Sequence, residues 1–210
     1  MGILSKYDLF IFDWDHTLTT STRLVTLLRI LDSWRSVGRA KGIRREYAPG
    51  NAIKEVKISE DVSKLYAILD NLYTYVSRPK LKDNTVPLLS YLKQRRKKVA
   101  IFSDSKTYRL MKETRLLGIM KHVDYALSAE AIGFYKPNPT GLLLIADKFG
   151  TKRAKALYVG DMATDILTAK FAGVGSCAVS NGVDSRERLR DAKPDYLFGN
   201  LREFMRAAKK

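Results

Sequence analysis

Residues 9–17 read Leu-Phe-Ile-Phe-Asp-Trp-Asp-His-Thr, an apolar run that ends in two carboxylates, Asp13 and Asp15. The run predicts a buried strand, and side chains two apart on a strand point to the same side, so both carboxylates can face one site. Two like charges this close need a divalent cation, or one carboxyl group that keeps its proton while the other stays ionised. The second arrangement supplies one acid and one nucleophile. The alternative is that both residues only form a turn or cap a helix after the strand.

Three further segments follow in order along the chain. Two of them place polar residues after an apolar run, and the other holds a lysine in a proline-rich loop. The first, Lys98-Val-Ala-Ile-Phe-Ser-Asp-Ser105, ends in the hydroxyl of Ser103 and precedes a helical pattern over 108–118. A hydroxyl followed by the amides of a helix N-terminus can bind an anion. A serine that only caps the helix fits the same pattern.

The second segment, Gly133-Phe-Tyr-Lys-Pro-Asn-Pro139, holds Lys136 in a proline-rich loop before a helix expected over 140–149. A residue before proline favours an extended backbone, which suits a lysine that reaches inward. Taken alone, Lys136 fits a solvated surface charge better, because most lysines are of that kind.

The third segment, Ala156-Leu-Tyr-Val-Gly-Asp-Met-Ala-Thr-Asp165, gives a strand, a glycine that permits close backbone approach, and two acids four residues apart. Asp161 at the strand end can bind a hard cation through oxygen. Asp165, one helical turn on, can orient Lys136 or a metal-bound water. Helix capping explains Asp161 alone but not the glycine and the second acid that accompany it.

The apolar runs predict an α/β fold. Runs near 8–12, 98–102, 156–159 and 175–179 are short, continuous and separated by helical patterns. This is typical of a Rossmann-like, doubly wound parallel sheet whose strands are buried on both faces. Ligands of such sheets bind at the carboxyl ends of the strands, where all four segments place their polar residues. A last edge strand is expected over 193–198, followed by a short helix over 201–208.

Residues 19–79 form an insertion longer than one crossover connection requires. They contain helical patterns over 23–37 and 61–76. We therefore expect a small α-helical cap at 19–79 and a core made of 1–18 and 80–210. The segment 38–57 within the cap is basic, and it is either a lip that steers an anionic ligand inward or a solvated basic surface.

In their order and spacing, the four segments resemble the haloacid dehalogenase superfamily, over roughly residues 7–200. Asp13-Trp-Asp-His-Thr17 matches the D-x-D-x-T signature. Ser103 matches the strand-end Ser or Thr, Lys136 the third-motif lysine, and Asp161 with Asp165 the acidic fourth motif. One departure is His16, where many phosphatases of the superfamily carry glycine.

This resemblance implies a Mg²⁺-dependent phosphatase with a type C1 cap, similar to phosphoglycolate phosphatases. Asp13 would be the nucleophile and Asp15 the general acid and base. The second aspartate disfavours dehalogenase activity. The implied metal ligands are Asp13, the backbone carbonyl of Asp15, and Asp161, with Asp165 beside them.

Ser103 and Lys136 would hold the transferring phosphoryl group. The residues expected to contact the substrate are Thr17, Ser103, Asp104, Lys136 and, from the cap, Arg44 and Arg45. A phosphomutase of the β-phosphoglucomutase type is the alternative enzyme.

The composition of the chain bears on membrane insertion, cellular location and disulfide bonds. The chain has 210 residues, 45% of them hydrophobic, and no run near the roughly 20 apolar residues of a membrane span. It shows no recognisable targeting segment, so a cytoplasmic location is expected. Its single cysteine, Cys177, excludes an intramolecular disulfide.

The formal net charge of +16 raises nucleic acid as a partner, or the ends of polynucleotides as substrates. The basic residues are spread along the chain with no binding module, so a small phosphorylated substrate is favoured over nucleic acid. The sequence leaves a monomer and a homodimer equally open.

Overall fold

The computed structural model describes residues 2–20 and 79–210. The chain divides into two compact units, one made of 1–20 and 79–210 and the other of 21–78. The predicted helices at 23–37 and 61–76, and with them Arg44 and Arg45, lie outside the described residues. The helical cap therefore stays a prediction, and the account below concerns the first unit.

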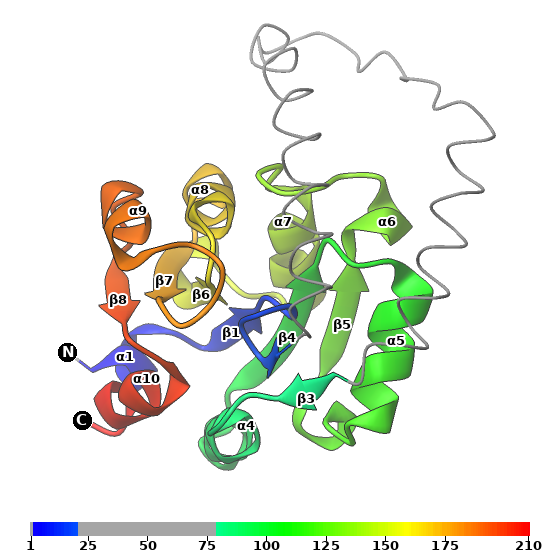
Figure 1. Ribbon diagram of the computed structural model, residues 1–210, viewed down its shortest axis with the longest axis horizontal. Helices are drawn as coiled ribbons and strands as arrows, with labels where there is room; N and C mark the ends of the chain where they lie inside the picture. The colour runs from blue at the N-terminus through cyan, green and yellow to red at the C-terminus, as the bar shows by residue number, and fades with distance from the viewer. Residues whose placement is uncertain (1, 21–78) are drawn as a thin grey trace, which may run out of the picture. The chain divides into compact units, whose positions relative to one another are not determined.

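A six-stranded parallel sheet forms the centre of this unit, in the order β5-β4-β1-β6-β7-β8 (Figure 1). This confirms the predicted α/β class, and the four long apolar runs are all strands. The strands are β1 (Leu9–Phe12), β4 (Lys98–Ser103), β5 (Tyr125–Ser128), β6 (Ala156–Gly160), β7 (Gly175–Val179) and β8 (Tyr196–Phe198). The edge strand β8 is shorter than the expected 193–198. The other edge strand, β5, was not predicted.

Helices cover both faces of the sheet (Figure 1), as a doubly wound fold requires. On one face, Phe10 and Phe12 pack against α4 (Thr85–Gln94), α5 (Thr107–Leu116) and α10 (Leu201–Ala208). On the other, Leu9 and Ile11 pack against α7 (Thr140–Lys148) and α8 (Ala163–Ala172). Successive β1 side chains thus alternate between two apolar layers, so β1 is buried along its whole length.

Shorter elements complete the unit. The helices are α1 (Ile3–Lys6), α6 (Ala129–Ile132) and α9 (Arg186–Asp191), with 3-10 turns at Met120–His122 and Arg153–Lys155. The two-residue strands β2 (Thr19–Thr20) and β3 (Lys80–Leu81) pair antiparallel. None of the described helices is long and apolar enough to cross a bilayer. Cys177 is a buried free thiol on β7, as its small-residue strand context predicts.

Strand register brings distant parts of the sequence to one edge. Phe12, the last residue of β1, pairs with Ile101 of β4 and Val159 of β6. All three strands run in the same direction, so their carboxyl ends lie together. The residues that follow them, rather than the strands themselves, make up the candidate site.

Candidate active site

Three buried aspartates meet at the carboxyl ends of β1 and β6. Asp13 is 4% exposed, and Asp161 and Asp165 are fully buried. Each offers a carboxylate oxygen within 4.8 Å of the others. The backbone N–H of Asp13 still donates to the Val159 carbonyl at 2.8 Å, so the sheet ladder fixes where this side chain begins. The sequence placed these three acids at one site, and the fold brings them together.

Lys136 enters this group from the loop between α6 and α7. Its Nζ atom lies 2.7 Å from Asp13 Oδ1 and 2.8 Å from Asp165 Oδ1. The Lys136 side chain is only 6% exposed, so it is not the solvated surface charge that most lysines are. Its backbone N–H donates to Asp104 Oδ1 at 3.1 Å, which ties the loop to the end of β4.

The buried group carries more negative than positive charge. Burial and the neighbouring Asp165 and Asp161 carboxylates raise the pKa of Asp13 well above its usual range, although Lys136 opposes this. Burial and Asp165 raise the pKa of Asp161 to about 6. Burial alone would lower the pKa of Lys136, but Asp13 and Asp165 outweigh it and raise that pKa well above normal. Burial is thus the largest cause of the raised pKa of both carboxyl groups, whereas neighbouring carboxylates are what raise the pKa of Lys136.

The remaining oxygens of Asp161 and Asp165 accept hydrogen bonds that fix their orientation. Thr17 Oγ1 donates to Asp161 Oδ1 at 2.7 Å, and the Val183 N–H donates to Asp161 Oδ2 at 2.7 Å. Asp165 accepts from the Tyr158 hydroxyl at 3.2 Å, and from the N–H groups of Asp161 and Met162 at 3.1 and 2.9 Å. Thr17, expected to touch substrate, thus binds a candidate metal ligand in this structure.

Two glycines let the backbone pass close to these carboxylates. A Cβ atom at Gly160 would lie 2.3 Å from Cγ of Asp165, as the sequence pattern anticipated. A Cβ at Gly182 would lie 2.1 Å from Oδ2 of Asp161. No side chain larger than hydrogen fits at either position without moving a buried aspartate. Gly182 has no motif in its neighbourhood that reveals this role from the sequence.

The carboxylate of Asp15 lies in different surroundings. Arg109 of α5 donates from both terminal nitrogens, at 3.1 Å to Asp15 Oδ1 and 2.6 Å to Asp15 Oδ2. Ser105 Oγ donates to Asp15 Oδ2 at 2.6 Å. Among the described residues, the group of acids that could hold a metal contains Asp13, Asp161 and Asp165 but not the Asp15 carboxylate. Arg109 and Ser105 were not singled out from the sequence.

Ser103 is linked to Asp15 through Ser105. It is 1% exposed, and its Oγ lies 2.7 Å from Ser105 Oγ, which in turn binds Asp15. Asp104 was expected to contact the substrate. In this structure its Oδ1 accepts the backbone N–H of Lys136 and so holds the Lys136 loop. His16 directly follows Asp15 and has φ 62°, in the left-handed region that glycine adopts at least cost.

The chemistry of the three aspartates fits a hard cation. Carboxylate oxygens are the preferred ligands of Mg²⁺ and Ca²⁺, and a cation would offset the excess negative charge described above. Asp13, Asp161 and Asp165 are thus a possible metal site.

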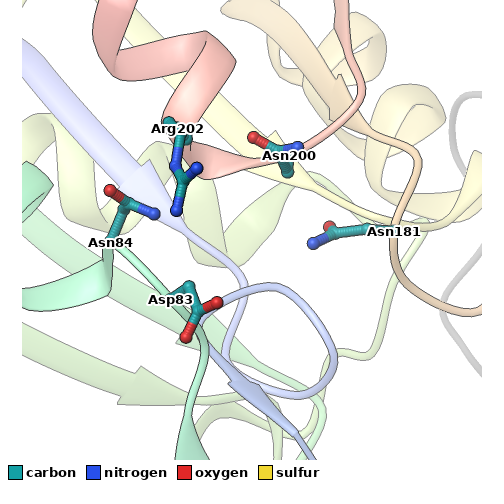
Figure 2. Close-up of a pocket in the computed structure, with 5 residues that line it drawn as sticks. All are labelled: Asp83, Asn84, Asn181, Asn200 and Arg202. Carbon is teal, nitrogen blue, oxygen red and sulfur yellow. The ribbon is translucent and has the colours of Figure 1, made fainter.

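A polar cavity of about 260 Å³ lies next to this region, lined by Asp83, Asn84, Asn181, Asn200 and Arg202 (Figure 2). None of the residues expected at the site lines it. Lys82 directly precedes the cavity residue Asp83. Its Nζ donates to the Asn181 carbonyl at 2.8 Å, and burial lowers its pKa while Asp161 and Asp13 oppose that shift. Lys82 is a further cation that the sequence motifs did not indicate.

Comparison with known proteins identifies the class. The model of the haloacid dehalogenase-like hydrolases matches residues 7–173, so the chain belongs to this family. A Clostridium perfringens protein named "Putative pyrophosphatase PpaX" is 26% identical over 197 residues, which cover 89% of this chain and 90% of that one. The phosphoglycolate phosphatase of Pasteurella multocida is 26% identical over 125 residues, which cover 60% of this chain and 56% of that enzyme. The match thus spans little more than half of the latter relative's length.

The fold is also shared with solved structures. A predicted phosphoglycolate phosphatase from Haemophilus somnus 129pt has a TM-score of 0.74 and 20% identity, with 96% of this chain and 97% of that chain covered. At this identity the likeness concerns the fold. The family match and the phosphatase names of the curated relatives confirm the hydrolase class expected from the four motifs.

Proposed function

We propose that this chain is a Mg²⁺-dependent phosphomonoester hydrolase that acts on a small phosphorylated metabolite through an aspartyl-phosphate on Asp13. The observation that carries the proposal is the buried group of Asp13, Asp161 and Asp165 at the strand ends, in which Lys136 contacts Asp13 and Asp165. The family and its phosphatase-named relatives support the same reaction class.

In the first step, an Asp13 carboxylate oxygen attacks phosphorus and the bond from phosphorus to the ester oxygen breaks. Asp15 gives a proton to the departing oxygen. Lys136 and the hydroxyl of Ser103 donate to the phosphoryl oxygens, where negative charge must be stabilised. Mg²⁺, held by the carboxylates of Asp13 and Asp161 with Asp165 beside them, would lessen the repulsion between an anionic nucleophile and an anionic substrate.

In the second step, water attacks phosphorus of the aspartyl-phosphate and passes a proton to Asp15. The bond between phosphorus and the Asp13 oxygen breaks, which releases inorganic phosphate and regenerates the carboxylate. Asp15 thus alternates between acid and base, and the protons balance over one turnover.

The substrate is expected to be a small monoester such as phosphoglycolate, a sugar phosphate or a nucleotide. Pyrophosphate joins this set because one relative is named a pyrophosphatase. Arg44 and Arg45, proposed to contact the leaving group, lie outside the described residues. The cytoplasmic location and the choice between monomer and homodimer also stay predictions.

The test is phosphate release from a panel of these compounds and a 5′-phosphorylated oligonucleotide, with Mg²⁺ and with EDTA. We expect Mg²⁺-dependent release from at least one small monoester, and a loss of at least about 10³-fold in Asp13→Asn. Release that persists in Asp13→Asn would exclude the aspartyl-phosphate route. A clear preference for the oligonucleotide would replace the metabolite with polynucleotide ends.

A further inference from the structure

Arg109 is a buried arginine that none of the four family motifs includes. It lies on the first turns of α5, directly after β4, and is 3% exposed. Its guanidinium presents two nitrogens to the two oxygens of Asp15, at 3.1 and 2.6 Å. A planar fork that engages both carboxylate oxygens fixes the direction of the carboxylate as well as its distance.

A second contact ties the same helix to the residue before Asp15. Glu113, one turn after Arg109, lies 3.6 Å from the Arg109 guanidinium and accepts the Trp14 indole N–H at 2.7 Å. Trp14 is fully buried. Helix α5 therefore contacts Trp14 through Glu113 and Asp15 through Arg109, two consecutive residues of the first motif.

Ser105 completes the set of donors. Its hydroxyl donates to Asp15, and Arg109 Nη2 also donates to that hydroxyl. The neighbouring hydroxyl of Ser103 lies 2.7 Å from it. Asp15 is thus held by a guanidinium and by a hydroxyl that also contacts Ser103, and its carboxylate is not one of the group of three aspartates.

We propose that Arg109 is a positioning residue that fixes the Asp15 carboxylate for proton exchange with the leaving group and with water. The inference rests on the proposed function, because it assigns to Arg109 a task only if Asp15 is the acid and base. Arg109 acts through Asp15, whose two carboxylate oxygens it contacts.

If Arg109 positions Asp15, the loss of kcat/KM in an Arg109 variant depends on the leaving group of the substrate. Loss of a merely structural arginine would affect all esters alike. The ratio kcat/KM reports steps up to the first irreversible one, which here is cleavage of the ester bond. An alkoxide needs a proton at that step, whereas p-nitrophenolate departs without one. Loss of Asp15, or of its position, should therefore lower kcat/KM for an alkyl ester more than for p-nitrophenyl phosphate.

The experiment measures kcat/KM with Mg²⁺ for p-nitrophenyl phosphate and for phosphoglycolate, or glucose 6-phosphate if the latter is hydrolysed better. The variants are Arg109→Gln, Arg109→Lys, Asp15→Asn and the double variant Arg109→Gln/Asp15→Asn. Arg115→Gln is the matched control, because Arg115 lies on the same helix but is exposed.

We expect Arg109→Gln to lower kcat/KM for the alkyl ester at least about tenfold more than for the aryl ester. Arg109→Lys should recover part of that selective loss, because it keeps the charge but not the fork. In the Asp15→Asn background, Arg109→Gln should add no selective loss, since the group that it positions is gone. Arg115→Gln should match the wild type on both esters.

Equal losses on the two esters in Arg109→Gln would reduce Arg109 to a structural residue and overturn the inference. A selective gain, or selective losses that add in the double variant, would overturn it as well. In each of these cases a fully active wild type leaves the proposed function intact. A wild type that releases no phosphate from any compound of the panel overturns the proposed function, and the role of Arg109 falls with it.

Arg109→Gln leaves Glu113 buried without its ion-pair partner, which can lower stability. Melting curves of each variant identify this effect. If Arg109→Gln does not fold, Arg109→Gln/Glu113→Gln removes both charges, and the same selective loss is expected of it. Equal losses on both esters in that folded variant would overturn the inference.

Discussion

Asp13 and Asp15 are two residues apart on the same chain segment, yet they lie in opposite electrostatic surroundings. Asp13 shares a buried group with two other carboxylates and one lysine, and the carboxylates outnumber the cation. Asp15 receives a guanidinium fork and a hydroxyl. The first arrangement favours binding of a further cation, whereas the second holds one carboxylate in one direction.

Spacing along a strand therefore does not by itself assign different roles to Asp13 and Asp15. The period of two brings both aspartates to one edge, but the partners that distinguish them come from α5 and from the loop that holds Lys136. The two cations differ too. Lys136 is a point charge between two aspartates, and Arg109 is a fork on one.

Among the changes that compare the surroundings of Asp13 and Asp15, the largest effect is expected of Lys136→Met, which removes the cation that contacts Asp13. Because Lys136 is proposed to hold the phosphoryl group for any substrate, kcat/KM should fall about 10²-fold or more on alkyl and aryl esters alike. Initial rates of phosphate release measure this. Equal losses in Lys136→Met and a selective loss in Arg109→Gln would show that the surroundings of Asp13 and of Asp15 have separate roles.

Lys152→Met is the control for that change, because Lys152 is an exposed lysine of the same unit. It should retain the activity of the wild type. A loss in Lys136→Met confined to the alkyl ester would contradict these separate roles, since it would make Lys136 act through the leaving group.

An intermediate effect is expected of Gly182→Ala. The new methyl group would meet Asp161 Oδ2 at 2.1 Å, and Asp161 is fully buried, so the carboxylate or the loop must move. We expect a loss of about 1 to 3 kcal/mol in the free energy of unfolding. Mg²⁺ should also bind about tenfold more weakly, which titration calorimetry measures.

Gly150→Ala is the comparison for Gly182→Ala, because a Cβ at Gly150 meets no atom within 4 Å. Gly150 has φ 59°, so this variant carries backbone strain without a clash near the aspartates. It should leave Mg²⁺ affinity unchanged. Unaltered Mg²⁺ affinity in Gly182→Ala would show that Asp161 does not take part in metal binding.

The smallest expected effect is a pH dependence of stability in EDTA. The folded-state pKa of Asp161 is about 6, against 3.8 for the ordinary carboxyl group. Between these values the folded chain holds a proton that the unfolded chain has lost, so stability falls as pH rises through this window and stays lower above pH 6. Asp161→Asn should reduce the fall in Tm between pH 5 and pH 7.5 by roughly 5 °C.

Mg²⁺ binds the deprotonated carboxylates, so it should raise Tm at pH 7.5 and do so much less at pH 5. Thermal melts with Mg²⁺ and with EDTA at the two pH values measure this. An Asp161→Asn variant that keeps the full pH dependence of the wild type would show that folding does not raise the pKa of Asp161.

The sequence by itself determined the parallel strands and the order in which polar residues reach their ends. Continuous apolar runs such as 9–12 and 156–159 indicate burial on both faces, and confirmed strands β1 and β6 are buried throughout. The half-exposed edge strand β5 has no such run, so it was not predicted. The same rule explains why the aspartates could be foreseen at one site, since Asp13 and Asp161 follow apolar runs and Asp165 lies one helical turn on. Lys136 lies in a proline-rich loop, and only its place among the four motifs indicated its role.

Only the tertiary structure decided which partner each aspartate has. Arg109 is 94 residues from Asp15, and Thr17 is 144 residues from Asp161. Gly182 contacts Asp161 through a loop without a motif. A local sequence pattern predicts the type of secondary structure and its burial, because both depend on neighbours along the chain. It does not encode which distant guanidinium, hydroxyl or backbone N–H meets a carboxylate, since that follows from the packing of α5 and the loops at the strand ends.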